Sequence, residues 1–338
     1  MKFGSLPVAE SNGVLLAHAI RRPGLTLKKG EWIGAGQIAA LQAAGISEIV
    51  VARAELGEVG ENEAAGRLAE SLAGAHVHRD KAYTGRCNLM AGCNGVLLAD
   101  APVIDRVNLV DESITLATLL PFRRVVEGEM IATAKIIPFA VARDTLDRAV
   151  AIASEAPLRI APFRPFRVGV VSTLLPGLKP STVTKTLHVF DERLARAGSR
   201  IAVEERVPHE TAPLVSALHR IESESDLIVI FGASAITDRR DIVPSAIEKA
   251  GGRIEHFGMP VDPGNLLLLG SLPGDAAEKP VIGAPGCARS PKENGFDFVL
   301  NRILAGIPVR SADIRRMGVG GLLLEIVTRP EPSAMPDG

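Results

Sequence analysis

The chain has 338 residues, of which 46% are hydrophobic and 23% are charged. This composition is typical of a folded globular protein and excludes disorder of the whole chain, and the length favours two domains over one. Lys and Arg number 38 against 39 Asp and Glu, which excludes the charge excess typical of nucleic-acid-binding proteins, so any anion site must be local.

The cysteines and the first residues indicate the compartment. Cys87, Cys93 and Cys287 are an odd and sparse set, which argues against a disulfide framework and fits a reducing environment. The opening residues lack the apolar core of a signal peptide, and no apolar run approaches the ~20 residues that span a bilayer. We expect a cytoplasmic protein without a membrane partner.

The first half of the chain predicts a mixed α+β domain over residues 1–160. Helical patterns occupy 37–44 and 60–74, and an apolar strand pattern lies between them at 47–54. Short apolar runs divided by Gly, Asn and Pro fill 81–138 and indicate β-rich structure, whose strand order the sequence does not give.

A proline-rich stretch at 160–166 precedes a change of pattern, after which strands and helices alternate over residues 166–309. The expected strands are 167–173, 200–207, 226–232, 253–260, 265–272 and 279–286, and the expected helices are 181–198, 210–224, 243–252 and 292–306. Such alternation predicts an α/β domain in three layers, with a mostly parallel sheet between helices. Residues 310–338 are expected to form a short extension that ends in a flexible tail at 329–338.

The most informative stretch is 226–241, which reads DLIVIFGASAITDRRD. An apolar strand ends in small residues and a polar cluster, and a helical pattern follows. In open α/β sheets such loops bind ligands, because strand ends and helix amino termini present unpaired N–H groups there. We therefore expect a site for an anionic, phosphate-bearing small molecule.

Three further loops follow apolar strands in the same way. Parallel strands bring their carboxyl ends to one edge of the sheet, so the polar and small residues of the four loops are expected to share one cleft. These residues are Ser172, Thr173, Ser234, Asp241, Asp262, Gly286, Arg289, Ser290 and Lys292.

Asp238 and Asp241 have two interpretations. Carboxylates suit a magnesium ion that bridges phosphate oxygens. Alternatively, Asp241 caps the helix that begins near Ile242 and stabilises it by about 1 kcal/mol. The two roles are compatible.

At these loops the sequence resembles the molybdopterin-binding domain of molybdopterin molybdotransferases and adenylyltransferases. The segments that carry the resemblance are VGVVST with Ser172 and Thr173, GASAITDRRDIVPSAI, AGGRIEHFGMPVDPGN, and PVIGAPGCARSP with Pro285 and Gly286. Over nearly its whole length the chain is also similar to molybdopterin-binding regions that are joined elsewhere to a nucleotidyltransferase domain. The resemblance implies molybdopterin or molybdenum cofactor as ligand, bound by Ser172, Thr173, Gly232, Ala233, Ser234, Asp262, Pro285, Gly286, Arg289 and Ser290.

The chain departs from the family pattern at several charged positions. Leu174, Leu175 and Pro176 stand where the molybdotransferases have Gly-Asp-Glu, Ala233 replaces the second glycine of a Gly-Gly pair, Asp262 replaces a lysine, and Cys287 and Ala288 replace Asn-Pro. Family chemistry depends on placed charges that stabilise phosphate groups, so the fold and the ligand class survive these changes better than catalysis does.

The resemblance implies a molybdopterin-binding protein in cofactor biosynthesis, delivery or maturation. One alternative is an active, magnesium-dependent molybdotransferase or nucleotidyl-transferring enzyme in which Asp241 is the candidate catalytic residue. Another is a non-catalytic scaffold for a separate nucleotidyltransferase protein. Family members commonly assemble, so a homo-oligomer is expected.

Overall fold

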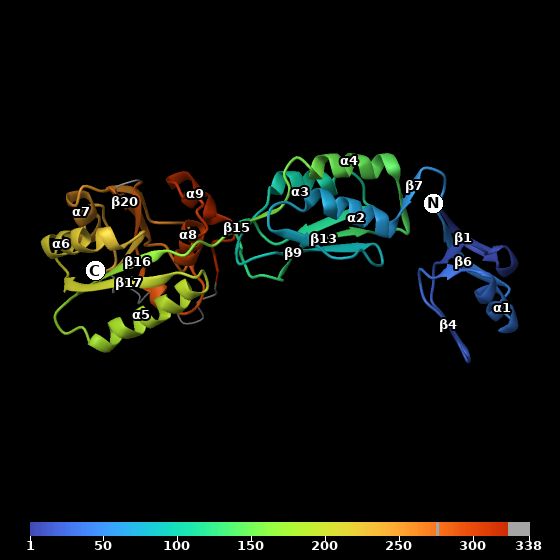
Figure 1. The fold of residues 1–338 in the computed structure, drawn as a ribbon, viewed down its shortest axis with the longest axis horizontal. Coiled ribbons are helices and arrows are strands. Elements are labelled where there is room, and N and C mark those ends of the chain that lie inside the picture. The colour runs from blue at the N-terminus through green and yellow to red at the C-terminus, as the bar shows by residue number, and fades with distance from the viewer. Residues whose placement is uncertain (275–276, 324–338) are drawn as a thin grey trace, which may run out of the picture. The chain divides into compact units, whose positions relative to one another are not determined.

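A computed structural model describes residues 1–274 and 277–323 of the chain (Figure 1). The chain forms two compact units, Met1–Ile160 and Ala161–Gly338, which we call the amino-terminal and carboxy-terminal units. No helix within the described ranges is long and apolar enough to cross a membrane. The tail predicted at 329–338 lies outside the described residues.

The amino-terminal unit begins with a four-stranded sheet of order β1-β6-β2-β5 and a hairpin of β3 and β4. The elements are β1 (Lys2–Pro7), a 3-10 helix (Val8–Glu10), β2 (Val14–Leu16), β3 (Ile20–Arg22), β4 (Leu25–Leu27), β5 (Trp32–Ile33), α1 (Ala35–Ala43) and β6 (Glu48–Arg53). Leu41 of α1 is buried in one cluster with Val14 and Ile33 of the sheet. This part of the unit therefore has a core of its own.

The rest of the amino-terminal unit combines sheets of order β11-β13-β9-β8 and β12-β10-β15, and the pair β14-β7, with three helices. The elements are β7 (Glu58–Gly60), α2 (Glu61–Leu72), β8 (Val77–Arg79), β9 (Arg86–Ala91), β10 (Gly95–Leu98), α3 (Ala101–Asn108), β11 (Ile114–Thr118), β12 (Arg124–Val125), β13 (Met130–Ile136), β14 (Ala140–Ala142), α4 (Arg143–Ala153) and β15 (Arg159–Pro162). The unit is thus a mixture of helices and strands, as predicted.

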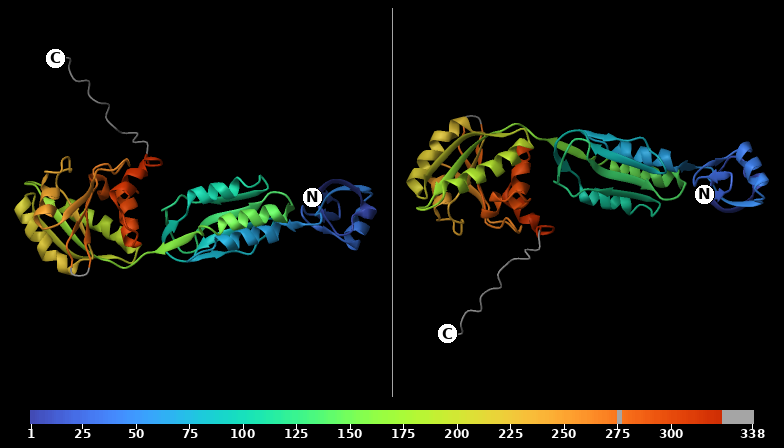
Figure 2. Two further views of the ribbon diagram at one scale, coloured as in Figure 1. Left: turned by 90° about the horizontal axis from the view of Figure 1, so that it is seen from above. Right: turned by 90° about the horizontal axis from the view of Figure 1, so that it is seen from below.

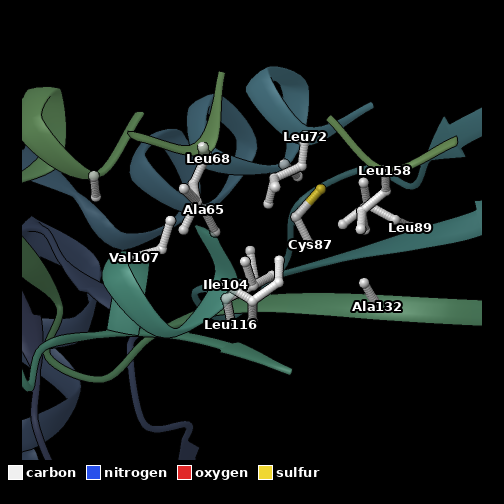
Figure 3. Close-up of a cluster of buried hydrophobic side chains, with 14 of the residues drawn as sticks. Ala65, Leu68, Leu72, Cys87, Leu89, Ile104, Val107, Leu116, Ala132 and Leu158 are labelled. Atoms are coloured by element: carbon white, nitrogen blue, oxygen red, sulfur yellow. The ribbon is translucent and has the colours of Figure 1, made fainter. Parts of the chain in front are cut away.

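One apolar face of α2 organises this second core. Ala65, Leu68 and Leu72 recur at three- and four-residue spacing and are buried, so they line one side of the helix. Figure 3 shows them facing the sheet residues Cys87 and Leu89. Burial of each large apolar side chain contributes about 1.5–3 kcal/mol, which is the main favourable term for the unit.

The carboxy-terminal unit contains a six-stranded sheet of order β17-β16-β18-β21-β20-β19. Its elements are β16 (Arg167–Leu174), α5 (Pro180–Ala195), β17 (Arg200–Pro208), α6 (Thr211–Ile221), a 3-10 helix (Glu222–Glu224), β18 (Leu227–Phe231), α7 (Ile242–Lys249), β19 (Arg253–Phe257), β20 (Leu268–Leu272), β21 (Lys279–Gly283), a 3-10 helix (Gly286–Arg289), α8 (Gly295–Leu304), α9 (Ser311–Arg315) and a 3-10 helix (Arg316–Gly318). The first four strands in this order, β17, β16, β18 and β21, pair in parallel. β20 pairs antiparallel with both β21 and β19. The predicted mostly parallel sheet is confirmed.

Helices cover both faces of this sheet (Figures 1 and 2). Val168 and Val170 of β16 join a buried cluster with α5 and α8, whereas Val171 joins a second cluster with α6 and α7. Successive side chains of a strand point to opposite faces, so a continuous apolar run supplies both clusters. Phe190 of α5 packs edge-on against Phe231 of β18, with ring centroids 5.5 Å apart. The three predicted layers are therefore present.

Candidate functional site

Four strands of the carboxy-terminal unit end at the same edge of the sheet. β16, β18 and β21 run parallel, and β19 runs in their direction because β20 is antiparallel to both of its neighbours. The loops that follow these strands are residues 175–179, 232–241, 258–267 and 284–294, and we call them loops 1 to 4. Parallel connectivity thus brings the loops predicted from the sequence to one edge.

Thr173, at the end of β16, joins β16 to loop 2. Its Oγ1 accepts a hydrogen bond from the Ala233 N–H at 2.8 Å and lies 2.8 Å from the Nδ1 atom of His209. The residue is only 2% exposed. A hydroxyl can both donate and accept, so Thr173 satisfies the Ala233 N–H and the His209 ring nitrogen together. Thr173 therefore fixes the start of loop 2 through protein contacts.

Arg289 joins loop 4 to loop 2. Its guanidinium donates to the Gly232 carbonyl at 2.8 Å and to Oγ1 of Thr186 in α5 at 3.2 Å, and it lies 5.6 Å from the ring centre of Phe231. Burial lowers the pKa of this group, but a guanidinium remains charged at neutral pH. Within the described ranges Arg289 forms no ion pair, so the edge holds a half-buried cation without a carboxylate partner.

Loop 3 contacts the first residue of α8, directly after loop 4, at Gly264 and Gly295. The Gly295 N–H donates to the Pro263 carbonyl at 2.8 Å. A Cβ atom on Gly264 would lie 2.8 Å from the Cα atom of Gly295, so only glycine permits this approach. Asp262 is held in turn by the segment after α9, because its main chain pairs with Gly321 and Leu323. Hydrogen bonds therefore join the end of β16 to loop 2, loop 2 to loop 4, and loop 3 to the start of α8.

Ser172 is the buried polar group of the edge that lacks a partner. It is 3% exposed, and its hydroxyl makes no hydrogen bond within the described structure. A buried hydroxyl without a partner carries a desolvation cost. Among the predicted loop residues, Ser234 and Gly286 are exposed, Ser290 is half-buried and Pro285 is buried.

The two predicted metal ligands make local hydrogen bonds. Asp241 caps α7: its carboxylate accepts from the Ile242 N–H at 2.8 Å and from the Thr237 N–H at 3.3 Å. Asp238 accepts from the main chain and the guanidinium of Arg240, which lower its pKa to about 2. No group of three His, Cys, Asp or Glu residues able to hold a metal occurs in the described part of the chain. A magnesium site at Asp238 and Asp241 stays a prediction.

Three residues of the site were not anticipated from the sequence. His209 follows β17, and its ring contacts the Thr173 hydroxyl. In α5, Thr186 accepts a hydrogen bond from Arg289, and Arg193 donates one to the Ala288 carbonyl of loop 4. Each acts on a partner far away in the chain, so local patterns carry no signal for them. The helical spacing of α5 does show that Thr186 and Arg193, which are seven residues apart, share one face.

The comparison with protein families bears on this edge directly. Residues 171–305 match the family model described as a probable molybdopterin binding domain. This segment belongs to the molybdopterin-binding domain family. The family segment begins within β16, contains all four loops and ends just after α8. Residues 5–53 match a second model, described as a domain of unknown function.

The search of solved structures finds weak similarities. The chain is similar to a molybdopterin biosynthesis moeA protein from Pyrococcus horikosii at 13% identity and a TM-score of 0.28, with 91% of this chain and 74% of that chain covered. It is similar to a molybdenum cofactor biosynthesis protein from Pyrococcus furiosus at 12% identity and a TM-score of 0.27, with 91% and 66% covered. Likeness at this level carries no argument about function. The search of curated proteins finds no match.

Proposed function

We propose that the carboxy-terminal unit binds molybdopterin, or the molybdenum cofactor built on it, at the four loops of this sheet edge, and that it acts in biosynthesis, delivery or maturation of that cofactor. The observation that carries this proposal is Arg289, a half-buried cation between loops 2 and 4 without an ion pair in the described part of the chain. The phosphate of the ligand supplies the missing negative charge. The family match of residues 171–305 supports a pterin phosphate as the anion.

The donors of the site suit a phosphate group. A guanidinium has five N–H donors, and Arg289 uses two hydrogen bonds on Gly232 and Thr186, which leaves N–H groups for a forked contact with phosphate oxygens. The unpaired Ser172 hydroxyl adds a group that can donate or accept. The ligand therefore completes two polar groups that the protein leaves incomplete.

The direct test is a fluorescence titration of the purified full chain with molybdopterin. We expect saturable binding that weakens as salt is added, because the contact is between charges. Replacing Arg289 by Gln should weaken binding by about tenfold to a hundredfold, the equivalent of the 1.5–3 kcal/mol of a hydrogen bond to a charged group. Arg196→Gln is the matched control, because Arg196 is an exposed arginine at the end of α5.

Two outcomes would contradict this proposal. Absence of saturable molybdopterin binding by the wild-type chain rejects the ligand. Equal losses in Arg289→Gln and Arg196→Gln reject Arg289 as the anion site. Repeating the titration with magnesium and ATP, and following the nucleotide products by mass spectrometry, separates binding alone from nucleotidyl transfer.

A further inference from the structure

Arg193 is buried in α5 beneath loop 4. Its side chain is 5% exposed, and Nε donates to the Asp297 carboxylate at 2.8 Å. One terminal nitrogen donates to the Ala288 carbonyl at 2.8 Å. The other donates to the carbonyls of Ser290 and Lys292, the latter at 3.1 Å. A single side chain from α5 thus holds three carbonyls of loop 4.

The two arginines at this edge differ in charge balance. Arg193 lies against Asp297, whose side chain is 12% exposed, so its positive charge is compensated inside the protein. Buried charges persist when they are paired and hydrogen-bonded, and Arg193 is paired with Asp297 and uses four of its five N–H donors. Arg289 has no such pair in the described structure. The compensated arginine supports the fold, and the uncompensated one is available to an anion.

The contacts of Arg193 bear directly on Arg289. Ala288 and Ser290 are the residues on either side of Arg289, and Arg193 holds both of their carbonyls. The Ala288 carbonyl lies in the same planar peptide unit as the Arg289 N–H, and the Ser290 carbonyl lies in the 290–291 unit, so the two contacts restrain the main chain on both sides of Arg289. Thr186, on the same face of α5, then accepts from the Arg289 guanidinium. Two residues on one face of α5 therefore restrain Arg289: Arg193 holds the main chain around it, and Thr186 contacts its guanidinium.

Asp297 extends this arrangement to the end of loop 4. One carboxylate oxygen accepts from Arg193, and the other accepts from the Asn294 N–H at 2.9 Å. Asn294 caps α8 and also donates to the carbonyls of Cys287 and Lys292. The loop is thus held from Cys287 to Asn294 by side chains that are themselves buried.

We propose that Arg193 is a positioning residue for anion binding: by holding the carbonyls of loop 4 it aims the uncompensated Arg289 at the phosphate of the ligand. The identity of that ligand rests on the function proposed above. The role of Arg193 in the loop itself does not, and it is measured without ligand.

The first test is hydrogen exchange of loop 4 in the full chain without ligand, comparing Arg193→Lys with wild type. Lysine keeps the charge beside Asp297, but its ammonium has three donors and cannot match the planar fork of arginine across four acceptors. We expect faster exchange of the amides of loop 4, with exchange of the central strand β18 unchanged. Arg196→Lys is the matched control. Unchanged exchange in loop 4 of Arg193→Lys would overturn the proposal.

The second test is a double-mutant cycle read by molybdopterin titration at a temperature where every variant is folded. Arg193→Lys should weaken binding by about tenfold in the wild-type background, as expected for a displaced charge-assisted contact. In the Arg289→Gln background it should cause no further loss, because residues that act through one contact are not additive. A purely structural effect of Arg193 would instead weaken binding equally in both backgrounds and would overturn the proposal.

A third variant changes the other member of the Arg193–Asp297 ion pair and leaves Arg193 itself intact. Asp297→Asn keeps the shape of the side chain and removes the charge that balances Arg193; we expect the same faster exchange in loop 4, and unchanged exchange would count against the proposal. Absence of molybdopterin binding by wild type rejects the proposed function, whereas the exchange result decides separately on Arg193.

Discussion

Replacement of Ser172 is expected to affect the free energy of unfolding and the affinity for molybdopterin in different ways. It is buried at the end of β16 without a hydrogen-bond partner in the described structure. Replacing Ser172 by Ala removes an unsatisfied group, so we expect the free energy of unfolding to stay level or rise by about 1 kcal/mol. If the hydroxyl contacts the phosphate, the same change weakens molybdopterin binding by about tenfold or more. Urea unfolding and fluorescence titration measure the two effects.

Ser225 provides the control for this prediction. It is also buried, but its hydroxyl donates to the Ile221 carbonyl at 2.7 Å. Ser225→Ala should therefore lose about 1 kcal/mol of stability while binding is kept. A loss of stability in Ser172→Ala as large as that in Ser225→Ala would show that Ser172 has a protein partner after all.

Individual residues also mark what the sequence does and does not reveal about the site. Ser172, Gly232 and Arg289 could be proposed in advance as candidates, because Ser172 lies near the carboxyl end of an apolar strand, the other two follow such strands, and these strand ends share an edge. The supporting residue Arg193 could not, because its ion-pair partner Asp297 lies 104 residues further along the chain. A buried arginine on an apolar helix face has no local signature of its partners.

At the scale of elements, helix α7 tests the two interpretations of Asp241. Its carboxylate caps the helix, so Asp241→Ala should lower the free energy of unfolding by about 1 kcal/mol. Asn is an equally good cap, so Asp241→Asn should keep stability and remove only the negative charge. If magnesium binds here, Asp241→Asn should abolish the magnesium dependence of molybdopterin binding. If it does not, urea unfolding and titration of Asp241→Asn will both match wild type.

The junction of β19 and α9 predicts a pH dependence of stability. His256 is 8% exposed, and its Nδ1 atom lies 2.9 Å from the Ser311 hydroxyl at the start of α9. Burial lowers the pKa of His256, the nearby cations Arg315 and Arg239 lower it further, and Glu255 partly opposes them. The folded state therefore favours the neutral imidazole.

The sign of the effect follows from linkage. Above the ordinary histidine pKa of about 6.5, neither the folded nor the unfolded state holds the proton, so His256 costs nothing. As pH falls below that value the unfolded state binds a proton first, so the free energy of unfolding falls until the pH passes the lower, folded pKa. Urea unfolding from pH 7.5 to 5 should show a smaller fall in His256→Gln than in wild type. His188→Gln, at an exposed position of α5, should behave as wild type.

Elements were easier to anticipate than their pairing. The spacing of Val183, Leu187, Phe190 and Leu194 predicts a helix at 181–198, and α5 occupies Pro180–Ala195. The apolar run 265–272 contains β20, but nothing in the run itself shows that β20 is antiparallel to its neighbours. In the first half, short strands interrupted by Gly and Pro join separate sheets, and long-range pairing decides their order.

At the scale of the whole molecule, each buried cluster draws its residues from one unit. Among residues 1–274 and 277–323, two clusters belong to the amino-terminal unit and two to the carboxy-terminal unit, one on each face of the six-stranded sheet. A segment with its own core can fold alone. The four loops, Arg193 and Arg289 all belong to the carboxy-terminal unit.

This arrangement predicts that a fragment of residues 161–338 folds and binds as the full chain does. We expect one cooperative unfolding transition for the fragment, because both of its clusters share a single sheet. Its dissociation constant for molybdopterin should equal that of the full chain, and Arg289→Gln should weaken both alike. A folded fragment that binds much more weakly would show that the amino-terminal unit supplies ligand contacts. An unfolded fragment would show that the two units stabilise each other, so the measurement separates a site made by one unit from a site made by both.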